Sequence, residues 1–190
     1  ILSSLAIYFS RIYQRKEIII GVPSLNRKGA RFKDTFGMFI SLSPLVINIE
    51  KTENSSQIIK KSKARLRELY RHQRYPLNDI CKRLKLLNHG RDTLFDIVLS
   101  YEKHQYSSTY GTATIRAKQQ FSGVARYPLA VTICDFSDND DITVFFEGAE
   151  NCFTTEDLQF FADRFLSILQ QICITPESPI NEIDLLTTQD

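Results

Sequence analysis

Three histidines, His72, His89 and His104, are the side chains of this sequence best suited to acid–base chemistry. A catalytic base must reach a nucleophile by a hydrogen bond, and it needs a partner that orients it. His72 instead follows a basic stretch with helical spacing, where the dipole at the helix C-terminus favours a cationic side chain. His89 lies in an Asn-His-Gly turn and His104 in a polar stretch. We therefore predict no catalytic residue in this chain.

Short motifs that position a nucleophile or a phosphate are also absent. No GxSxG, GxxxxGK(S/T) or GxGxxG occurs, which argues against a nucleophile elbow, a P-loop and a dinucleotide site. Asp138, Asp140 and Asp141 lack the later bidentate glutamate of an EF-hand, so we interpret them as part of a hairpin turn. The cysteines occur singly, without metal-ligand spacing, which predicts reduced thiols and no metal site: Cys81, Cys134, Cys152 and Cys173.

A basic cluster spans residues 60–74, but its positive side chains alternate with an apolar helical face and no aromatic platform accompanies them. The formal net charge of +2, from 24 basic and 22 acidic residues, offers no general attraction for nucleic acid or an anionic membrane. We interpret the cluster as a solvated helix face. Docking of an acidic protein stays open as the alternative.

The elements that must position these residues begin with a helix, whose apolar residues follow helical spacing: Leu2, Leu5, Phe9 and Ile12. We expect an amphipathic helix to which the first residue already belongs, and hence a chain that starts inside a longer protein. Residues 17–22 predict a buried strand and residues 24–34 a polar loop. The longest apolar runs are far shorter than the roughly 20 residues of a membrane span, and no signal-like segment opens the chain, which favours a cytoplasmic protein.

The middle of the chain predicts an interrupted strand over residues 36–50, in which Pro44 indicates a bulge or an edge position. Asn54 or Ser55 is expected to cap a helix that runs to about residue 70. Pro76 then forces a break before a short helix over residues 77–86, and a strand over residues 94–101 follows. The inner face of the longer helix is expected to hold Ile58, Ile59, Leu66 and Leu69.

The C-terminal part predicts a hairpin, with strands over residues 129–136 and 142–146 joined by turn-forming residues. Thr154 and Asp157 have the spacing of a capping box at the start of the last helix. The buried face of that helix is expected to hold Leu158, Phe161, Phe165, Ile168 and Ile172. The mixed order of helices and strands predicts an α/β (α+β) sandwich, in which a mixed β-sheet is flanked by helices.

Four stretches, in this order, resemble motifs from the C-terminal part of condensation domains in nonribosomal peptide synthetases. Residues 21–27 are similar to GxPxxxR, and residues 36–45 are similar to (I/V)GxFVNTLPL. Residues 72–77 are similar to HQDxPF, and residues 91–95 to RDxSRNPLF with a deletion. The chain ending resembles the linker before the next module, so the resemblance covers nearly the whole chain.

The resemblance implies one of the family's two chloramphenicol acetyltransferase-like halves, a C-terminal subdomain over residues 1–176 followed by an exit linker over residues 177–190. In the family, a tunnel between the halves admits the phosphopantetheine arms of two carrier proteins, and the acceptor amine attacks the donor thioester. The assisting histidine belongs to an HHxxxDG motif of the other half, which does not occur in this sequence. This half would therefore contribute tunnel wall and carrier-docking surface, and we expect it to be inactive alone.

The resemblance also implies roles for particular residues. The substrate-tunnel candidates are Gly37, Phe39, Ser41 and Ser43. Ser41 replaces the family's usual Asn and can still donate a hydrogen bond. Motif or structural roles fall to Arg27, His72, Pro76, Arg91 and Asp92. In the alternative interpretation, residues 36–45 are only an interrupted strand, and Arg27, Arg91 and Asp92 only pair internally.

No cofactor is expected to bind directly, since phosphopantetheine is carried by the partner carrier proteins. The expected partners are the N-terminal condensation subdomain, peptidyl carrier proteins and a downstream adenylation domain, but neither nucleic acid nor a membrane. Two alternatives stay open. The chain is a standalone module that binds a carrier protein, or it is part of an epimerization-type domain of the same fold, which residues 36–45 and 94–101 disfavour.

Overall fold

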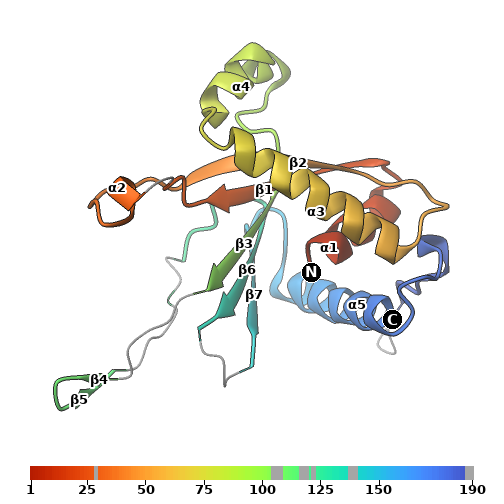
Figure 1. Cartoon of the computed structure of the whole chain (residues 1–190). Helices are drawn as coiled ribbons and strands as arrows, with labels where there is room; N and C mark the ends of the chain where they lie inside the picture. Colours follow the sequence, from red (N-terminus) through yellow and green to blue (C-terminus); the bar gives the residue numbers. More distant parts are fainter. Residues whose placement is uncertain (28–29, 104–108, 116–119, 121–122, 137–140, 187–190) are drawn as a thin grey trace.

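The computed structural model describes residues 1–190 apart from 28–29, 104–108, 116–119, 121–122, 137–140 and 187–190. Its centre is a five-stranded mixed sheet with the strand order β2-β1-β3-β6-β7 (Figure 1). The inner strands run parallel: β1 (Glu17–Ser24), β3 (Ile97–Lys103) and β6 (Leu129–Asp135). The edge strands run antiparallel to their neighbours: β2 (Ser41–Asn48) and β7 (Thr143–Gly148).

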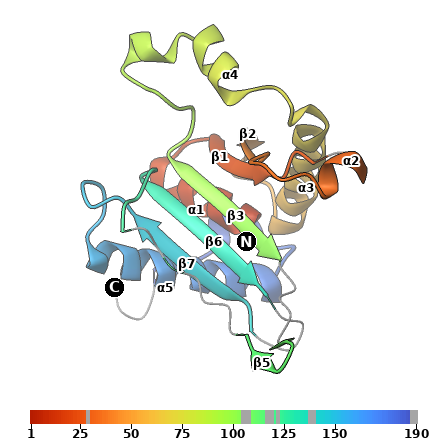
Figure 2. The same cartoon turned by 90° about the vertical axis from the view of Figure 1, so that its left-hand side faces the viewer.

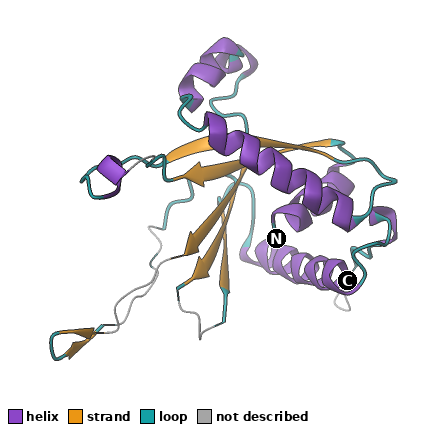
Figure 3. Ribbon diagram, in the orientation of Figure 1, coloured by secondary structure: helices purple, strands orange, loops and turns teal. Residues whose placement is uncertain are grey.

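Three helices pack on one face of this sheet: α1 (Leu2–Tyr13), α3 (Ser55–His72) and α5 (Thr155–Ile174). Figure 2 shows α1 and α5 behind β3, β6 and β7. Alternate residues of each strand face these helices, as Leu129, Val131 and Ile133 do in β6, and together they form one core. The predicted mixed sheet with flanking helices is confirmed (Figure 3).

The first helix, α1, is buried more deeply than the amphipathic pattern predicts. Every residue from 3 to 10 is buried, because α1 contacts β1 as well as α3 and α5. Small polar side chains therefore lie inside, and Ser10 Oγ donates a hydrogen bond to the carbonyl oxygen of Arg15 at 2.5 Å. Ile12, predicted on the inner face, is instead 42% exposed, since the last turn of α1 extends beyond the core.

The strand predicted over residues 36–50 is shorter in the structure. β2 begins at Ser41 and pairs with β1 in one unbroken antiparallel register, in which Pro44 lies opposite Gly21. Pro44 thus takes the edge position and forms no bulge, and the edge of a sheet tolerates its missing N–H. Before β2, Gly37 adopts a φ of 146°, a backbone conformation that interrupts an extended strand.

α3 begins with the predicted capping box, formed by Asn54 and Gln57. On its predicted inner face Ile58 is buried, but Ile59 is 43% exposed. The prediction for Ile59 was wrong, because Ser62 occupies the inner position one turn after Ile58 and leaves Ile59 at the margin of the buried face. The two leucines predicted for this face are partly buried against the core: Leu66 and Leu69.

After α3 the chain breaks at Pro76, as predicted, and continues in α4 (Leu77–Arg83) and the 3-10 helix η1 (Leu86–His89), which project beyond the end of α3 in Figure 1. Residues 24–34, predicted as a polar loop, contain α2 (Ala30–Lys33). The chain also forms two short strands that the sequence pattern did not predict, β4 (Thr109–Tyr110) and β5 (Ala113–Thr114). The predicted hairpin is formed by β6 and β7. Most of its turn, residues 137–140, lies outside the described residues, as does His104.

The last helix, α5, follows its prediction closely. The amide N–H of Asp157 donates to Thr154 Oγ1 at 3.1 Å, and the amide N–H of Thr154 donates to Asp157 Oδ2 at 2.8 Å. This is the predicted capping box, and it places the start of α5 at Thr155. Of the five predicted core residues, Leu158 is partly buried against the core. The other four are buried: Phe161, Phe165, Ile168 and Ile172.

The residues after α5 fold back onto the domain through η2 (Ile180–Glu182). Ile180 and Ile183 are 2% and 6% exposed and belong to the common core. Glu177 accepts hydrogen bonds from Asn54 Nδ2 at 2.9 Å and from Ser56 Oγ at 2.5 Å, at the start of α3. A boundary between domain and exit linker at residue 176 stays a prediction, and the described part of the proposed linker is packed.

Candidate functional site

Arg27, the last residue of the GxPxxxR-like stretch, organises the loop between β1 and β2. Its guanidinium donates hydrogen bonds to the carbonyl oxygens of Phe32 and Thr35, both at 2.6 Å, and of Gly37 at 2.9 Å. The guanidinium carbon also lies 4.2 Å from the ring centroid of Phe39. The planar guanidinium presents several N–H groups in a fixed geometry and can stack on an aromatic ring with the same group. Arg27 therefore pairs internally and shapes the loop that carries two tunnel candidates.

This loop holds apolar side chains in solvent. Phe36 and Met38 are almost fully exposed, and Ile40 is 61% exposed. Gly37 is exposed between them, whereas Phe39 is half-buried under the guanidinium of Arg27. Soluble domains rarely gather several large apolar side chains on one exposed segment unless another surface covers them. We refer to residues 36–40 as the apolar loop.

The other two tunnel candidates, Ser41 and Ser43, lie on β2. Ser43 is buried, whereas Ser41 is half-buried and joins three elements. Its Oγ lies 3.1 Å from Ser24 Oγ at the end of β1 and donates to the carbonyl oxygen of Gln73 at 3.3 Å, just after α3. The hydrogen-bonding capacity expected of Ser41 is thus used, and it connects the second motif-like stretch to the third.

The third motif-like stretch surrounds the end of α3. His72 is the last residue of α3 and is exposed, so its side chain lies at the C-terminal end of the helix. The part of the chain that the structure describes gives its imidazole no hydrogen-bonded nucleophile and no orienting partner. Pro76 is the N-cap residue of α4 and has a φ of −66°. His72 therefore ends one helix and Pro76 precedes the next.

The fourth motif-like stretch contains an internal ion pair. Arg91 donates from Nη2 to Asp96 Oδ1 at 2.8 Å and from Nε to the carbonyl oxygen of Thr93 at 3.3 Å. Asp92 is exposed and forms no ion pair or hydrogen bond within the described residues. Arg91 therefore pairs internally, with Asp96, whereas Asp92 has no such partner among the described residues.

Phe95 makes a contact that the sequence did not predict. Its side chain is 1% exposed and packs on Gly21, where an added Cβ would overlap the phenyl ring. The ring of Tyr127 lies beside it, with the centroids 5.6 Å apart. Gly21 therefore joins the first motif-like stretch to the fourth through close approach. The available signal was a glycine inside an apolar strand, which often marks such an approach.

A polar cluster at the carboxyl ends of β3 and β6 was also missed. Tyr101 Oη donates to Asp135 Oδ2 at 2.5 Å, and Lys103 Nζ lies 3.1 Å from the same oxygen. The hydrogen bond from Tyr101, followed by that from Lys103, lowers the pKa of the Asp135 carboxyl, and the bond to Asp135 raises the pKa of the Tyr101 hydroxyl. The parallel register of β3 and β6 brings these residues together, which no local pattern reveals.

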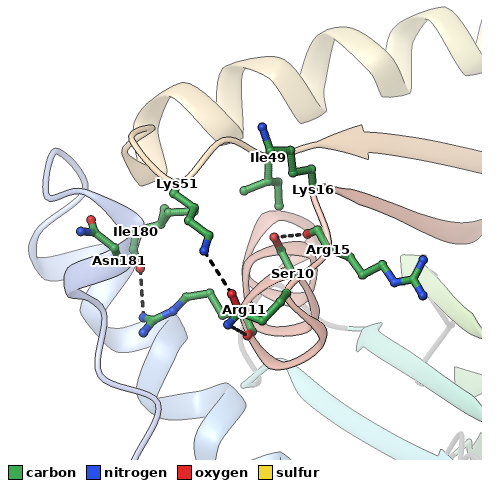
Figure 4. Close-up of a pocket in the computed structure, with 9 residues that line it drawn as sticks. Ser10, Arg11, Arg15, Lys16, Ile49, Lys51, Ile180 and Asn181 are labelled. Carbon is green, nitrogen blue, oxygen red and sulfur yellow. Dashed lines mark hydrogen bonds between the residues drawn. The ribbon is translucent and has the colours of Figure 1, made fainter.

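A small pocket of about 190 Å³ lies at the C-terminal end of α1 (Figure 4). Four cations line it, and three of them, Arg11, Lys16 and Lys51, are engaged by described residues, Lys51 through Gln14 Oε1 at 3.2 Å. Arg11 donates to the carbonyl oxygens of Ile180, at 3.0 Å, and Ile183, and Lys16 pairs with Glu50 at 2.7 Å. The pocket therefore serves to attach the tail to α1 and offers little unpaired charge to an anion.

Three further expectations can be compared with the described residues. No group of three or more His, Cys, Asp or Glu side chains among them could hold a metal ion. All four cysteines are free, as predicted, and burial raises the pKa of the Cys134 thiol. Within the same residues, no helix is both long and apolar enough to cross a bilayer.

The mixed sheet with helices on one face belongs to the chloramphenicol acetyltransferase-like class of folds, as the solved structures show. A variant of the starter condensation domain of the rhizomide synthetase RzmA superposes with a TM-score of 0.86 at 23% identity, over 98% of this chain and 42% of that one. The first condensation domain of the CDA synthetase superposes with a TM-score of 0.76 at 19% identity, over 98% of this chain and 41% of that one.

The family model of the condensation domain matches residues 1–190, and the chain belongs to this family. Among curated proteins, surfactin synthase subunit 1 of Bacillus subtilis is 27% identical over 97% of this chain, and gramicidin S synthase 2 of Aneurinibacillus migulanus is 24% identical over 93% of it. The chain spans only 5% and 4% of the lengths of these two relatives.

Proposed function

We propose that this chain is the C-terminal half of a peptide-synthetase condensation domain. In this role it contributes tunnel wall and carrier-docking surface to amide-bond formation between carrier-bound aminoacyl or peptidyl thioesters. The observation that carries the proposal is the apolar loop, which Arg27 holds through the carbonyl oxygen of Gly37 and the ring of Phe39 and which carries Phe36 and Met38 almost fully exposed. An exposed apolar loop of fixed shape suits the wall of a tunnel that a second half completes.

The division of labour follows from the residues. Among the described residues, no basic side chain lies beside both a nucleophile and a partner that would orient it. In this proposal the chain therefore positions the substrates, and the HHxxxDG histidine of the other half assists the attacking amine. Holding two tethered thioesters in line replaces a bimolecular encounter by an intramolecular one and is a large catalytic term. The phosphopantetheine arms come from partner carrier proteins, and an adenylation domain downstream and a cytoplasmic setting belong to the same proposal.

Reconstitution with the missing half tests this function. The chain is mixed with a separately produced N-terminal condensation half and with loaded donor and acceptor carriers, and the amide product is measured by mass spectrometry. We expect product only when both halves are present, and none when the second histidine of HHxxxDG is replaced by alanine. Product formed at the same rate by this chain alone would contradict the proposal.

The apolar loop allows a sharper version of the experiment. Phe36→Ser with Met38→Ser removes two exposed apolar side chains of the loop, and we expect it to weaken the association of the halves. Leu87→Ser with Ile174→Ser is the matched control, since these side chains are 79% and 70% exposed on other elements. Equal weakening by both pairs would show that the apolar loop has no special part in assembly.

A standalone module that binds a carrier protein is the second candidate. It is favoured by exposed cations of α3 whose side chains form no ion pair with the described residues: Lys60, Lys63, Arg67 and Arg71. It predicts that the chain alone binds a carrier as a stable monomer, which analytical ultracentrifugation and titration would detect. An epimerization-type domain of the same fold would instead invert the stereocentre of a carrier-bound aminoacyl group after reconstitution, which chiral chromatography of the hydrolysed product distinguishes from amide formation.

A further inference from the structure

A cavity of about 630 Å³ opens at the edge of the sheet where β1, β3 and β6 begin. Its lining includes the first residue of each of these strands, Glu17, Ile97 and Leu129. The tunnel candidate Ser41 lies opposite Ser24, at the other end of β1. Because a strand rises about 3.3 Å per residue, Glu17 and Ser24 are about 23 Å apart along β1. We call this cavity, which is separate from the tunnel candidates, the strand-start cavity.

The wall of the strand-start cavity consists of packed core side chains. Phe9 of α1, Ile18 of β1 and Phe95 before β3 line it, and all three are buried. The exposed ring of Tyr13 stacks on Phe9, with the ring centroids 6.0 Å apart and the ring planes 7° from parallel. Packed side chains keep their conformations, so this apolar wall exists before any ligand binds. Binding cavities for small molecules have such preformed apolar walls and volumes of about 300–1,000 Å³.

A second cavity, of about 330 Å³, adjoins the first between α1 and the start of α5. The two cavities share four lining residues: Phe9, Tyr13, Cys152 and Phe153. The side chains of Tyr8, Phe160 and Phe161 line the second cavity alone and make it aromatic as well. The molecule therefore offers two adjoining apolar spaces, which suits a ligand with two apolar side chains rather than one.

The charged side chains of the strand-start cavity show which polar groups such a ligand carries. Arg91 and Asp96 neutralise each other in an ion pair. Arg15 and Glu17 are exposed, and their side chains form no hydrogen bond or ion pair with any described residue. In Figure 4 the side chain of Arg15 extends away from Lys51 and from the small pocket drawn there. One cation and one carboxylate are thus left unpaired at the same cavity, which is complementary to a zwitterion.

We propose that the strand-start cavity and the adjoining cavity bind a short peptide of two apolar residues with free termini. Arg15 binds the terminal carboxylate, for which a planar guanidinium is the best-matched donor, and Glu17 accepts hydrogen bonds from the terminal ammonium. The two apolar side chains occupy the two cavities. This ligand site goes beyond the tunnel wall and carrier docking proposed above and does not depend on them, because it lies at the opposite end of β1 from the tunnel candidates.

Cys152 reports whether the cavities are occupied. Its thiol is free and exposed and lines both cavities, whereas Cys173, also free and exposed, lies near the end of α5. The full chain is treated with N-ethylmaleimide in the presence and absence of phenylalanyl-leucine, and mass spectrometry follows the alkylation of each cysteine. With the dipeptide at about ten times its dissociation constant, we expect alkylation to slow at least about fivefold at Cys152 and to change by less than about twofold at Cys173.

Calorimetric titration with end-blocked dipeptides assigns the two charges. We expect phenylalanyl-leucine amide and N-acetyl-phenylalanyl-leucine each to bind about tenfold more weakly than the free dipeptide. Arg15→Gln should weaken binding of the free dipeptide by a similar factor and leave binding of the amide unchanged, because the amide has no carboxylate. Glu17→Gln should spare the acetylated dipeptide in the same way. Equal weakening of all three ligands by either variant would mean that these side chains do not contact the termini.

Matched variants locate the site. Arg74→Gln with Asp79→Asn removes one cation and one carboxylate from exposed positions around the start of α4, and we expect it to change the affinity by less than about twofold. Tyr13→Ser should weaken binding of every dipeptide at unchanged charge, since it removes part of the apolar wall. Tyr110→Ser, at an exposed position on β4, is its control and should have no effect. Circular dichroism checks that each variant is folded.

Three outcomes would overturn the proposal. The first is the same change, or none, in the alkylation of Cys152 and Cys173 when the dipeptide is added. The second is a doubly blocked dipeptide, or free leucine, that binds as tightly as phenylalanyl-leucine. The third is protection of Cys152 that rises with protein concentration without any peptide, because a second copy of the chain then fills the cavity. None of these measurements uses product formation, so failure of this site and failure of the proposed tunnel function are distinguishable.

Discussion

Arg27 shows at the scale of single residues how a motif-like position acts on its own backbone. Its fork binds the carbonyl oxygens of Phe32, Thr35 and Gly37 and covers the ring of Phe39. A lysine would keep the charge but has one compact donor group and no planar face. The residue therefore preserves the shape of the apolar loop, and its contribution to a tunnel wall is indirect.

Arg27→Lys and Arg27→Gln test this role. We expect both to leave the melting temperature almost unchanged, because the contacts are exposed, and to raise chymotryptic cleavage in the apolar loop about fivefold, since local opening follows the loss of local hydrogen bonds. Mass spectrometry of the fragments locates the cuts. If the lysine variant resists cleavage as well as arginine does, charge alone holds the loop and the fork geometry has no part.

Gly21→Ala tests the other residue-scale contact. The added Cβ would overlap the ring of Phe95, so we expect a loss of about 1–3 kcal/mol in the free energy of unfolding, as overpacking of a core usually costs. Urea titration measures the loss. The double variant Gly21→Ala with Phe95→Leu should lose less stability than the sum of the losses of the two single variants. Additive losses would mean that the two residues do not compete for space.

At the scale of elements, the helices with capping boxes were the easiest to predict. Thr154 and Asp157 at the start of α5, and Asn54 with Gln57 at the start of α3, satisfy backbone N–H groups within four residues of sequence. The strand containing Pro44 was harder. Its apolar residues begin at Phe36, yet pairing with β1 begins only at Ser41, because Gly37 and the contacts of Arg27 give the preceding residues another conformation.

The capping box of α5 predicts an acid-dependent loss of stability. Hydrogen bonds from the amide and hydroxyl of Thr154 lower the pKa of the Asp157 carboxyl in the folded chain. The carboxylate therefore stabilises the fold above its unfolded pKa of about 3.9 and loses this effect as the pH falls through its lower folded value. Asp157→Asn should lower the melting temperature at pH values near about 7 and make it less sensitive to acid below about pH 4.

Glu156→Gln is the control for the acid titration, because it removes a negative charge from the same helical turn but leaves the capping box intact. We expect Glu156→Gln to retain most of the acid sensitivity. Scanning calorimetry at a series of pH values compares the two variants. The same acid response in both would assign the effect to general charge near the helix start.

At the scale of the whole molecule, the sheet and its helices depend on the tail. Ile180 and Ile183 complete the core beside α1, and Glu177 accepts hydrogen bonds from the start of α3. The apolar loop, by contrast, exposes Phe36, Met38 and Ile40 to solvent. The chain thus has a closed core and a candidate contact surface outside it.

Deleting residues 177–190 tests whether the tail is part of the domain. Burial of two isoleucine side chains stabilises by at most about 3–6 kcal/mol, so we expect the shortened chain to unfold at much lower urea concentration. Ile180→Ala with Ile183→Ala in the full-length chain should reproduce much of the loss. A shortened chain as stable as the full one would support the predicted boundary at residue 176, with the remaining residues acting only as a linker.

The sequence by itself determined the order of the main elements, the capped helices, the hairpin strands, the free cysteines and the resemblance to condensation domains, because each rests on residues close together along the chain. Only the tertiary structure decided that Phe95 fills the space over Gly21, that Tyr101 meets Asp135, that Ser41 joins the end of α3, and that the tail packs beside α1. Such contacts depend on strand order and register, which local periodicity leaves undetermined.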